Sequence, residues 1–350
     1  YPAQWQADIV SEVPSTSRMN LPVRHAVLDS PRGPAMYPIR QIQRYRQLEN
    51  RFQGAMPDVL HTYFFWSIIY GRVLKARGVV PRLVENREDL GFAWGRHEYA
   101  LLALTRQLPD RVICVSDAVR DVVLAREGLD RSRVRVIRNG ITCLDSDQDP
   151  RLEDLRTELG LSPDHLVVGM VANYDRPVKG VDVFLESIPL IRAAVPQSRF
   201  VLLGQGQTEA RVRSHAARLG IDDVLLMPGF REDVHRFYAL MDVSVLTSFS
   251  EGLSITILES MKYGVPVVVT DVGGNPEIVS NGRTGFLVPP GNSYKFADAV
   301  IQMLRDPSSR QRFGRDARRV VEFEFDLAHV SRQYEQVYRQ LLGNSRSDAP

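Results

Sequence analysis

The chain has 350 residues, of which 44% are hydrophobic and 25% charged, as expected for a globular protein of two domains. No apolar run reaches the roughly 20 residues of a membrane span, no charged-then-apolar leader opens the sequence, and two cysteines are too few for a disulfide framework. We therefore expect a cytoplasmic protein. The net charge is only +2, but residues 1–140 carry 21 Lys and Arg against 14 Asp and Glu, which favours either an anionic partner or simply a solvated surface.

The beginning of the sequence is unusual for an α/β protein. Residues 1–36 show no strand followed by a glycine-rich turn and a helix, which indicates that a piece of the first domain lies outside this sequence. Residues 38–56 then have the pattern of an amphipathic helix, which either covers the first sheet or lies on an anionic membrane surface. Its apolar stripe consists of Ile39, Ile42, Tyr45, Leu48 and Phe52, with Arg40, Arg44, Arg46 and Arg51 around it.

Strand and helix patterns alternate through the rest of the first half. Alternation of this kind is typical of a parallel sheet. An acidic stretch without apolar periodicity, residues 144–154, is the predicted interdomain linker. We expect strands at 57–65, 80–89, 111–119 and 133–140 and helices at 66–77, 95–108 and 117–127.

The second half repeats the alternation more clearly. Short β-branched runs are separated by amphipathic helical patterns, and the sequence therefore predicts two Rossmann-like domains of the α/β class, each with a doubly wound parallel sheet. We expect strands at 165–173, 199–206, 223–230, 242–248 and 265–274 and helices at 181–195, 209–220, 233–241, 293–306, 308–322 and 328–342.

The segment 248–279, SFSEGLSITILESMKYGVPVVVTDVGGNPEIV, carries the most chemistry. It predicts a strand end, a turn through Gly252 that lets the backbone come close to a ligand, and a helix capped by the Ser254 hydroxyl. Free amides of Leu253, Ser254 and Ile255 at the helix start make a seat for a diphosphate. Of the two glutamates, Glu251 and Glu259, one can accept from sugar hydroxyls and the other from a ribose diol, although such a pair alone usually marks a solvated helix face.

This segment resembles glycosyltransferase family 4 and its relatives of the GT-B fold. The strings EGLSITILE, KYGVPVVVTDVGGNPEIV and NGRTGFLVPPGN match the family's hallmark of two glutamates, a G-x-P-V-V string and a Gly-Gly turn. The resemblance implies two Rossmann-like domains that face a cleft. Residues 1–143 would form the acceptor side, residues 144–326 would bind the donor, and the helix within 327–350 would pack back on the first domain.

Further donor contacts follow from the same resemblance. Lys179 matches a lysine that contacts the diphosphate and, with Glu251, is a predicted catalytic residue. Asn173 stands where many members have an arginine. Gly204 and Gly206 would lie beside the nucleotide, although a plain strand-to-helix turn also explains them. The base would meet Phe230 and Arg231, and Arg231 could supply the missing positive charge.

The acceptor side is less well defined by the sequence. Many relatives carry a histidine after the strand that corresponds to 80–89, where this chain has Glu85, Asn86 and Arg87. We take His61, Arg87 and His97 as the candidate acceptor residues. A lone histidine is more often structural than functional.

Metal and cofactor sites are not predicted. The string DSDQD (145–149) has the aspartate spacing of metal-dependent transferases, but a solvated hinge explains it better, and the two cysteines and seven histidines form no zinc pattern. We therefore expect no metal, no cofactor and no nucleic-acid partner.

The predicted function is a retaining transfer of sugar from a nucleotide diphosphate donor to the hydroxyl of a carbohydrate or lipid-linked acceptor, in bacterial-type polysaccharide, glycolipid or glycoconjugate synthesis. The reaction would be a front-face substitution, performed at the inner face of the membrane. Two alternatives stay open, which are a nucleotide-sugar epimerase of the same fold and a catalytically silent nucleotide-sugar binding subunit. A dehydrogenase is disfavoured because no G-x-G-x-x-G opens a first strand–helix unit.

Overall fold

A computed structural model describes residues 10–11, 25–28, 57–92, 94–143 and 152–343. The amphipathic segment 38–56 and the DSDQD string both lie outside these residues. The chain divides into two compact units, with Tyr1–Arg138 and His329–Pro350 in unit 1 and Asn139–Ala328 in unit 2. The sequence-based division placed its boundaries after residues 143 and 326.

Unit 1 contains a six-stranded sheet in which strand order follows the chain. The first strand pairs antiparallel with the second, and all further pairs are parallel. Two strands lie within residues 1–36, where the sequence predicted none, because runs of two and four residues are too short for periodicity to reveal. The strands are β1 (Val10–Ser11), β2 (His25–Leu28), β3 (Val59–Thr62), β4 (Leu83–Arg87), β5 (Arg111–Cys114) and β6 (Val134–Val136).

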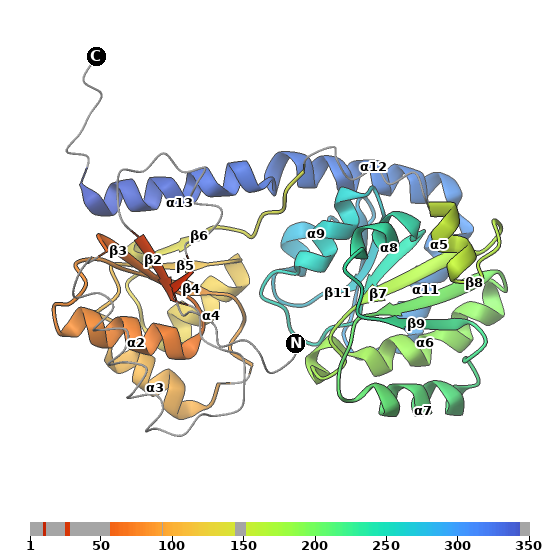
Figure 1. Cartoon of the computed structure of the whole chain (residues 1–350), viewed down its shortest axis with the longest axis horizontal. Coiled ribbons are helices and arrows are strands. Elements are labelled where there is room, and N and C mark those ends of the chain that lie inside the picture. The colour runs from red at the N-terminus through yellow and green to blue at the C-terminus, as the bar shows by residue number, and fades with distance from the viewer. Residues whose placement is uncertain (1–9, 12–24, 29–56, 93, 144–151, 344–350) are drawn as a thin grey trace, which may run out of the picture. The chain divides into compact units, whose positions relative to one another are not determined.

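Three helices, α2 (Phe65–Ala76), α3 (Arg96–Leu104) and α4 (Asp117–Glu127), connect the strands from β3 to β6, with a 3₁₀ turn at Arg131–Arg133. Since the strand order in the described part of unit 1 does not reverse, right-handed crossovers carry these helices to one face. Figure 1 shows α2 and α3 on the side of the strands opposite to α13 (Leu327–Leu342). The core beneath α13 consists of Val59, Val84, Ile113 and Ile137 with Val330, Val337, Tyr338 and Leu341.

Unit 2 contains a second sheet of six parallel strands, in the order β12-β11-β10-β7-β8-β9. The order reverses between β7 and β10, so this sheet is doubly wound and has its switch point at these two neighbours. Ligands of open α/β sheets bind at the carboxyl ends of the strands at such a point. The strands are β7 (Leu166–Val171), β8 (Ser198–Leu203), β9 (Leu225–Gly229), β10 (Val243–Leu246), β11 (Val267–Thr270) and β12 (Gly285–Val288).

Helices cover both faces of this sheet (Figure 1). One face carries α6 (Val181–Ala194), α7 (Glu209–Leu219) and α11 (Ser293–Arg305), and α11 packs on α6. The other carries α5 (Leu152–Glu158), α8 (Val234–Leu240), α9 (Ile255–Lys262) and α12 (Pro307–Glu324), with a short α10 (Asn275–Ile278) after β11.

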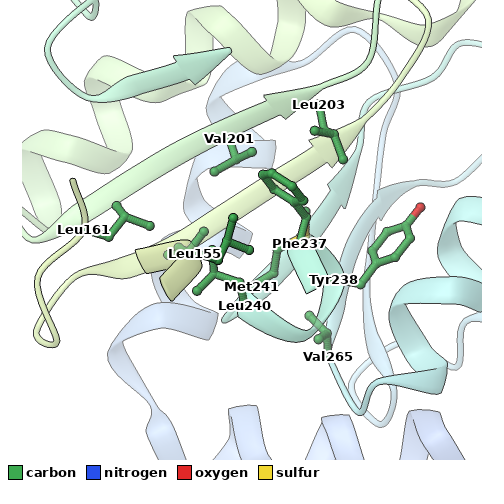
Figure 2. Close-up of a cluster of buried hydrophobic side chains, with 10 residues drawn as sticks. Leu155, Leu161, Val201, Leu203, Phe237, Tyr238, Leu240, Met241 and Val265 are labelled. Carbon is green, nitrogen blue, oxygen red and sulfur yellow. The ribbon is translucent and has the colours of Figure 1, made fainter. Parts of the chain in front are cut away.

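Helix α5 corrects the predicted linker, which extended through residue 154. The helix begins at Leu152, and its Leu155 is fully buried in a core cluster against α8. Acidic residues hid this single apolar anchor, because a helix of seven residues shows almost no periodicity. Figure 2 shows this core cluster, which consists of Leu155, Leu161, Val167, Val201, Leu203, Phe237, Tyr238, Leu240, Met241 and Val265.

Candidate functional site

Two of the predicted site residues meet at the switch point of unit 2. Lys179 ends the 3₁₀ turn after β7 (Pro177–Lys179), and Glu251 follows β10. The Lys179 Nζ lies 2.7 Å from the Glu251 Oε1, and the side chains are only 16% and 9% exposed. The residues are far apart in sequence, and they meet because β7 and β10 are adjacent in the sheet.

The loops that carry this ion pair are bonded to each other. The Thr247 hydroxyl donates to the carbonyl oxygen of Gly180 at 2.8 Å, and the Phe249 amide donates to the carbonyl of Val178 at 2.7 Å. A Cβ atom on Gly180 would lie 2.1 Å from the Thr247 carbonyl oxygen, and the φ of Gly180 is +64°. Only glycine tolerates both conditions, so the close approach of the two loops depends on it.

A chain of hydrogen bonds from buried hydroxyl and amide groups holds Glu251 in place. The Ser248 hydroxyl donates to the Glu251 Oε1 at 2.6 Å, and the Thr270 hydroxyl donates to the Ser248 carbonyl at 2.6 Å. The Asn275 side-chain amide in turn donates to the Thr270 carbonyl at 2.9 Å. Sequence reasoning gave these three residues no role, although each is a short polar residue within the motif, at or after a strand end.

The start of α9 differs from the prediction in detail. The Ser254 hydroxyl caps no backbone amide and instead contacts the Thr256 hydroxyl at 3.0 Å. Because the helix begins at Ile255, its first free amides are those of Ile255, Thr256 and Ile257, whereas Leu253 and Ser254 precede it. Gly252, Leu253 and Ser254 are all buried. The helix terminus still provides a partial positive charge for an anion.

Glu259 lies within α9 and receives a hydrogen bond from another helix. The Tyr238 hydroxyl donates to its Oε2 at 2.7 Å. Burial raises the pKa of Glu259 above its usual value, and the hydrogen bond from Tyr238 and the charge of Lys262 offset only part of that effect.

The turns after β7 and β8 pack tightly on each other. The Asn173 side-chain oxygen accepts from the Asp175 amide at 2.8 Å, and Asp175 accepts from the Gln207 and Thr208 amides at 2.9 Å. A Cβ atom on Gly204 would lie 1.9 Å from the Ala172 carbonyl oxygen, and one on Gly206 would lie 2.9 Å from the Asp175 amide nitrogen. Contact between the turns therefore explains both glycines without a nucleotide.

The predicted base-side residues follow β9. Phe230 is 54% exposed, as an aromatic side chain that meets a ligand would be. Arg231, in contrast, already pairs with Glu158 at 2.6 Å and with Asp233 at 2.8 Å. Its charge is therefore compensated within unit 2, which weakens its assignment as the missing cation beside Asn173.

The structure gives Arg87 a structural role in place of the predicted acceptor contact. Its side chain is 1% exposed and pairs with Glu85 at 2.9 Å and Glu127 at 2.8 Å. Arg72, equally buried, donates to both oxygens of Glu85. Alternation along β4 directs Glu85 and Arg87 to the face of the sheet that α2 and α4 cover. A lone charge there would be very costly, whereas a paired one is retained.

The two predicted acceptor histidines lie on different elements of unit 1. His61, on β3, is 1% exposed, with its Nδ1 2.7 Å from the Tyr338 hydroxyl and its Nε2 3.4 Å from the Asn86 Oδ1. Its ring also lies 4.6 Å from that of Tyr63. His61 is therefore enclosed by other side chains, as expected for a histidine with a structural role. The His97 side chain, on α3, is 86% exposed beside Glu98.

Metal-binding clusters and membrane-spanning helices are both absent from the described residues. In these parts of the chain, no group of three or more His, Cys, Asp or Glu side chains is arranged to hold a metal ion. Within the same residues, no helix combines the length and the apolarity needed to cross a membrane.

Two family models match the chain. Residues 152–320 match "Glycosyl transferases group 1", and residues 4–143 match "Glycosyltransferase Family 4". The two matched ranges correspond closely to the two units of the structure.

Individual relatives are more distant. The N-acetyl-alpha-D-glucosaminyl L-malate synthase of Bacillus anthracis is 30% identical over 196 residues, which are 56% of this chain and 51% of that protein. The chain thus spans about half the length of this curated relative. The UDP-Gal:alpha-D-GlcNAc-diphosphoundecaprenol alpha-1,3-galactosyltransferase of Escherichia coli is 26% identical over 259 residues, or 71% of this chain and 67% of that one.

Solved structures share the fold. Anabaena Alr3699/HepE in complex with UDP-glucose has a TM-score of 0.77 at 21% identity, covering 87% of this chain and 84% of that chain. This similarity and the doubly wound sheet of unit 2 show the GT-B fold. The two family models, which match residues 4–143 and 152–320, show that the chain belongs to glycosyltransferase family 4.

Proposed function

We propose that the protein is a retaining glycosyltransferase that moves a sugar from a nucleotide diphosphate donor to an acceptor hydroxyl. The observation that carries this proposal is the Lys179–Glu251 pair, which lies at the switch point of unit 2, just before the N-terminus of α9. Such a place combines a cation, free backbone amides and a carboxylate, which are the groups that a diphosphate and a sugar require.

Lys179 would stabilise the charge that grows on the departing diphosphate. Its ammonium has three donors, so it can keep its bond to Glu251 while it binds phosphate oxygens. The amides at the start of α9 would act on the same charge. Each well-aimed donor of this kind is worth about 3 kcal/mol in comparable oxyanion sites.

Glu251 would hold the transferring sugar. Its Oε1 already accepts from Lys179 and Ser248, and within the described residues its Oε2 has no hydrogen-bond partner. That oxygen is available to a sugar hydroxyl, whereas the pairing of Oε1 makes the carboxylate a weak nucleophile. This supports front-face substitution, in which the leaving diphosphate takes the acceptor proton, over a covalent glycosyl–enzyme intermediate.

The acceptor would be a carbohydrate or a lipid-linked sugar. The Escherichia coli relative, as its name states, acts on a diphosphoundecaprenol-linked sugar, and this likeness supports a lipid-linked acceptor at the inner face of a bacterial membrane. The Anabaena structure contains UDP-glucose, which makes UDP-sugars the first donors to test.

The experiment is an assay of nucleoside diphosphate release from UDP-sugars with a panel of free and polyprenyl-linked acceptors, followed by NMR of the product. We expect release that requires an acceptor, a product of retained anomeric configuration, and a loss of about 100-fold in kcat for Lys179→Met. An inverted product would contradict the retaining mechanism.

A catalytically silent binding subunit is the second candidate, favoured by Asn173 and by the pre-paired Arg231. It would bind donor without turnover against every acceptor. Conversion of the nucleotide sugar into its epimer without any acceptor, and without net release of nucleoside diphosphate, would instead favour the epimerase.

A further inference from the structure

We propose that two buried hydroxyl groups position the donor-binding glutamates, that of Ser248 for Glu251 and that of Tyr238 for Glu259. The inference rests on the proposed function and adds a division of labour. Ser248 would serve recognition of the sugar, and Tyr238 would serve recognition of the nucleoside. Both are positioning residues, because neither need touch the donor itself.

The sugar end is built from the loop after β10. Ser248 is fully buried, and its hydroxyl lies 2.6 Å from the Glu251 Oε1. Its backbone carbonyl is fixed by the Thr270 hydroxyl at the end of β11, so Ser248 cannot move independently of the sheet. With Lys179 on the same oxygen, the carboxylate of Glu251 is held in one orientation that leaves Oε2 for a ligand.

The nucleoside end is built from two helices. Tyr238 belongs to the core cluster of unit 2 and is 1% exposed, and Figure 2 shows its hydroxyl oxygen directed away from the surrounding aliphatic side chains. That hydroxyl donates to the Glu259 Oε2 at 2.7 Å. The Tyr263 ring stacks on the Tyr238 ring, with 6.4 Å between the ring centroids and 14° between the ring planes. This stacking further limits rotation of the Tyr238 side chain. Within the described residues, Oε1 of Glu259 has no hydrogen-bond partner.

The two arrangements follow one scheme. In each, a buried hydroxyl occupies one carboxylate oxygen and the other oxygen is left for a ligand hydroxyl, which a carboxylate binds strongly only if its lone pairs already point correctly. The two hydroxyls come from different elements and share no partner. Their effects on the two ends of the donor should therefore be independent and additive.

Calorimetry can distinguish recognition of the nucleoside from recognition of the sugar. Dissociation constants for a nucleoside diphosphate and for the corresponding nucleotide sugar are measured with Ser248→Ala, Tyr238→Phe and the double variant. For Tyr238→Phe we expect binding of both ligands to weaken about ten-fold, with an unchanged ratio of the two constants. For Ser248→Ala we expect unchanged binding of the nucleoside diphosphate, loss of the extra affinity given by the sugar, and a lower kcat.

Matched variants control for a general loss of packing. Ser187→Ala removes a buried serine hydroxyl from α6, and Tyr338→Phe removes a buried tyrosine hydroxyl from unit 1, and both should leave the two constants unchanged. Ser248→Thr should restore sugar recognition. In a carboxylate NMR titration, Tyr238→Phe should raise the pKa of Glu259 further, because the lost hydrogen bond favours the charged form.

Two results would overturn the inference in distinguishable ways. If Ser248→Ala and Tyr238→Phe change neither constant while Glu251→Gln and Glu259→Gln do, the glutamates bind donor without positioning and this inference fails alone. If all four variants bind both ligands as the wild type does, the site itself is wrong and the proposed function fails with it.

Discussion

At the scale of single residues, Glu259 illustrates a conflict between stability and binding. Its carboxylate is partly buried and has a raised pKa, because burial penalises the charged form more than Tyr238 and Lys262 favour it. The folded state therefore binds a proton more tightly than the unfolded state does. Selection for folding alone would favour a neutral hydrogen-bond acceptor at this position. The presence of a carboxylate therefore indicates that it binds a ligand.

We predict that Glu259→Gln raises the melting temperature at neutral pH and weakens nucleotide binding roughly 10- to 100-fold, the usual value of a charged hydrogen bond. The penalty in the wild type is fully present above the folded pKa and is relieved as pH falls through it. The stabilising effect of the substitution should therefore shrink as pH falls toward 4.5, the ordinary pKa of a glutamate. Thermal unfolding of both proteins between pH 5 and 8 measures it, and an equal or lower melting temperature of the variant at pH 7.5 would be inconsistent with this account.

Gly180 is a residue whose backbone determines the site. We predict that Gly180→Ala destabilises unit 2 by more than 2 kcal/mol and abolishes donor binding, because strain at positive φ is joined by the collision with the Thr247 carbonyl. Gly220→Ala is the control, since its φ is +66° and no atom lies within 4 Å of the added Cβ. Denaturant unfolding of both should give the control a loss of about 1 kcal/mol. Equal losses would mean that the contact between the loops is not rigid.

At the scale of elements, a buried ionic network joins α2, β4 and α4. Arg72, Glu85, Arg87 and Glu127 are each 2% exposed or less and form ion pairs of 2.8 to 3.7 Å. Burial alone would raise the pKa of Glu85, but the two guanidinium groups outweigh it and lower that pKa. Its stabilising contribution is therefore present at neutral pH and is lost only as pH falls through the lowered value.

We predict that Glu127→Gln destabilises unit 1 by about 3 to 5 kcal/mol, since it leaves part of the charge of Arg87 buried without compensation. Glu322→Gln provides the comparison, because it removes an exposed pair with Arg318 and should cost under about 0.5 kcal/mol. Urea unfolding followed at far-ultraviolet wavelengths measures both. Similar small losses for the two variants would show that the network tolerates a missing charge.

The sequence predicts those elements whose pattern is long or strongly periodic. The helices at Val181–Ala194 and Ser293–Arg305 and the strands β7 to β11 lie where apolar spacing placed them. Strand β12 and helix α5 were not predicted, because four residues after a glycine turn and seven residues in an acidic stretch are too short to carry a period. The fate of charged strand residues such as Arg87 depends on the helices that cover the strand, and no local pattern contains that information.

At the scale of the whole molecule, the part of the site that could be predicted is the part whose residues are close together in sequence. The turn and helix around Glu251 and Glu259 lie in one segment and were predicted from it. To predict the ion pair of Lys179 with Glu251, one also needs the strand order of unit 2, in which β10 lies beside β7. To predict the contacts of Tyr238 and Ser248, one needs the side-chain positions as well. Sequence thus indicates which groups are present, and topology determines which of them meet.

We also predict that the rate of sugar transfer does not depend on divalent metal ions. In the proposed function, Lys179 and the terminus of α9 would supply the positive charge that a divalent cation supplies in other transferases. Transfer rates should therefore be equal in excess chelator and in millimolar magnesium or manganese. Activity that is lost with chelator and restored by metal would instead assign a role to the aspartates at 145–149.

The central claim is that the switch point of unit 2 binds the diphosphate of a nucleotide sugar. Isothermal titration of UDP, GDP and ADP into the wild type and into Lys179→Met tests it most directly. We expect at least one of them to bind the wild type with a stoichiometry of one. The substitution should weaken this binding at least ten-fold, because a charged hydrogen bond contributes about 1.5 to 3 kcal/mol. Equal affinity of the two proteins, or no binding of any nucleoside diphosphate, would contradict it.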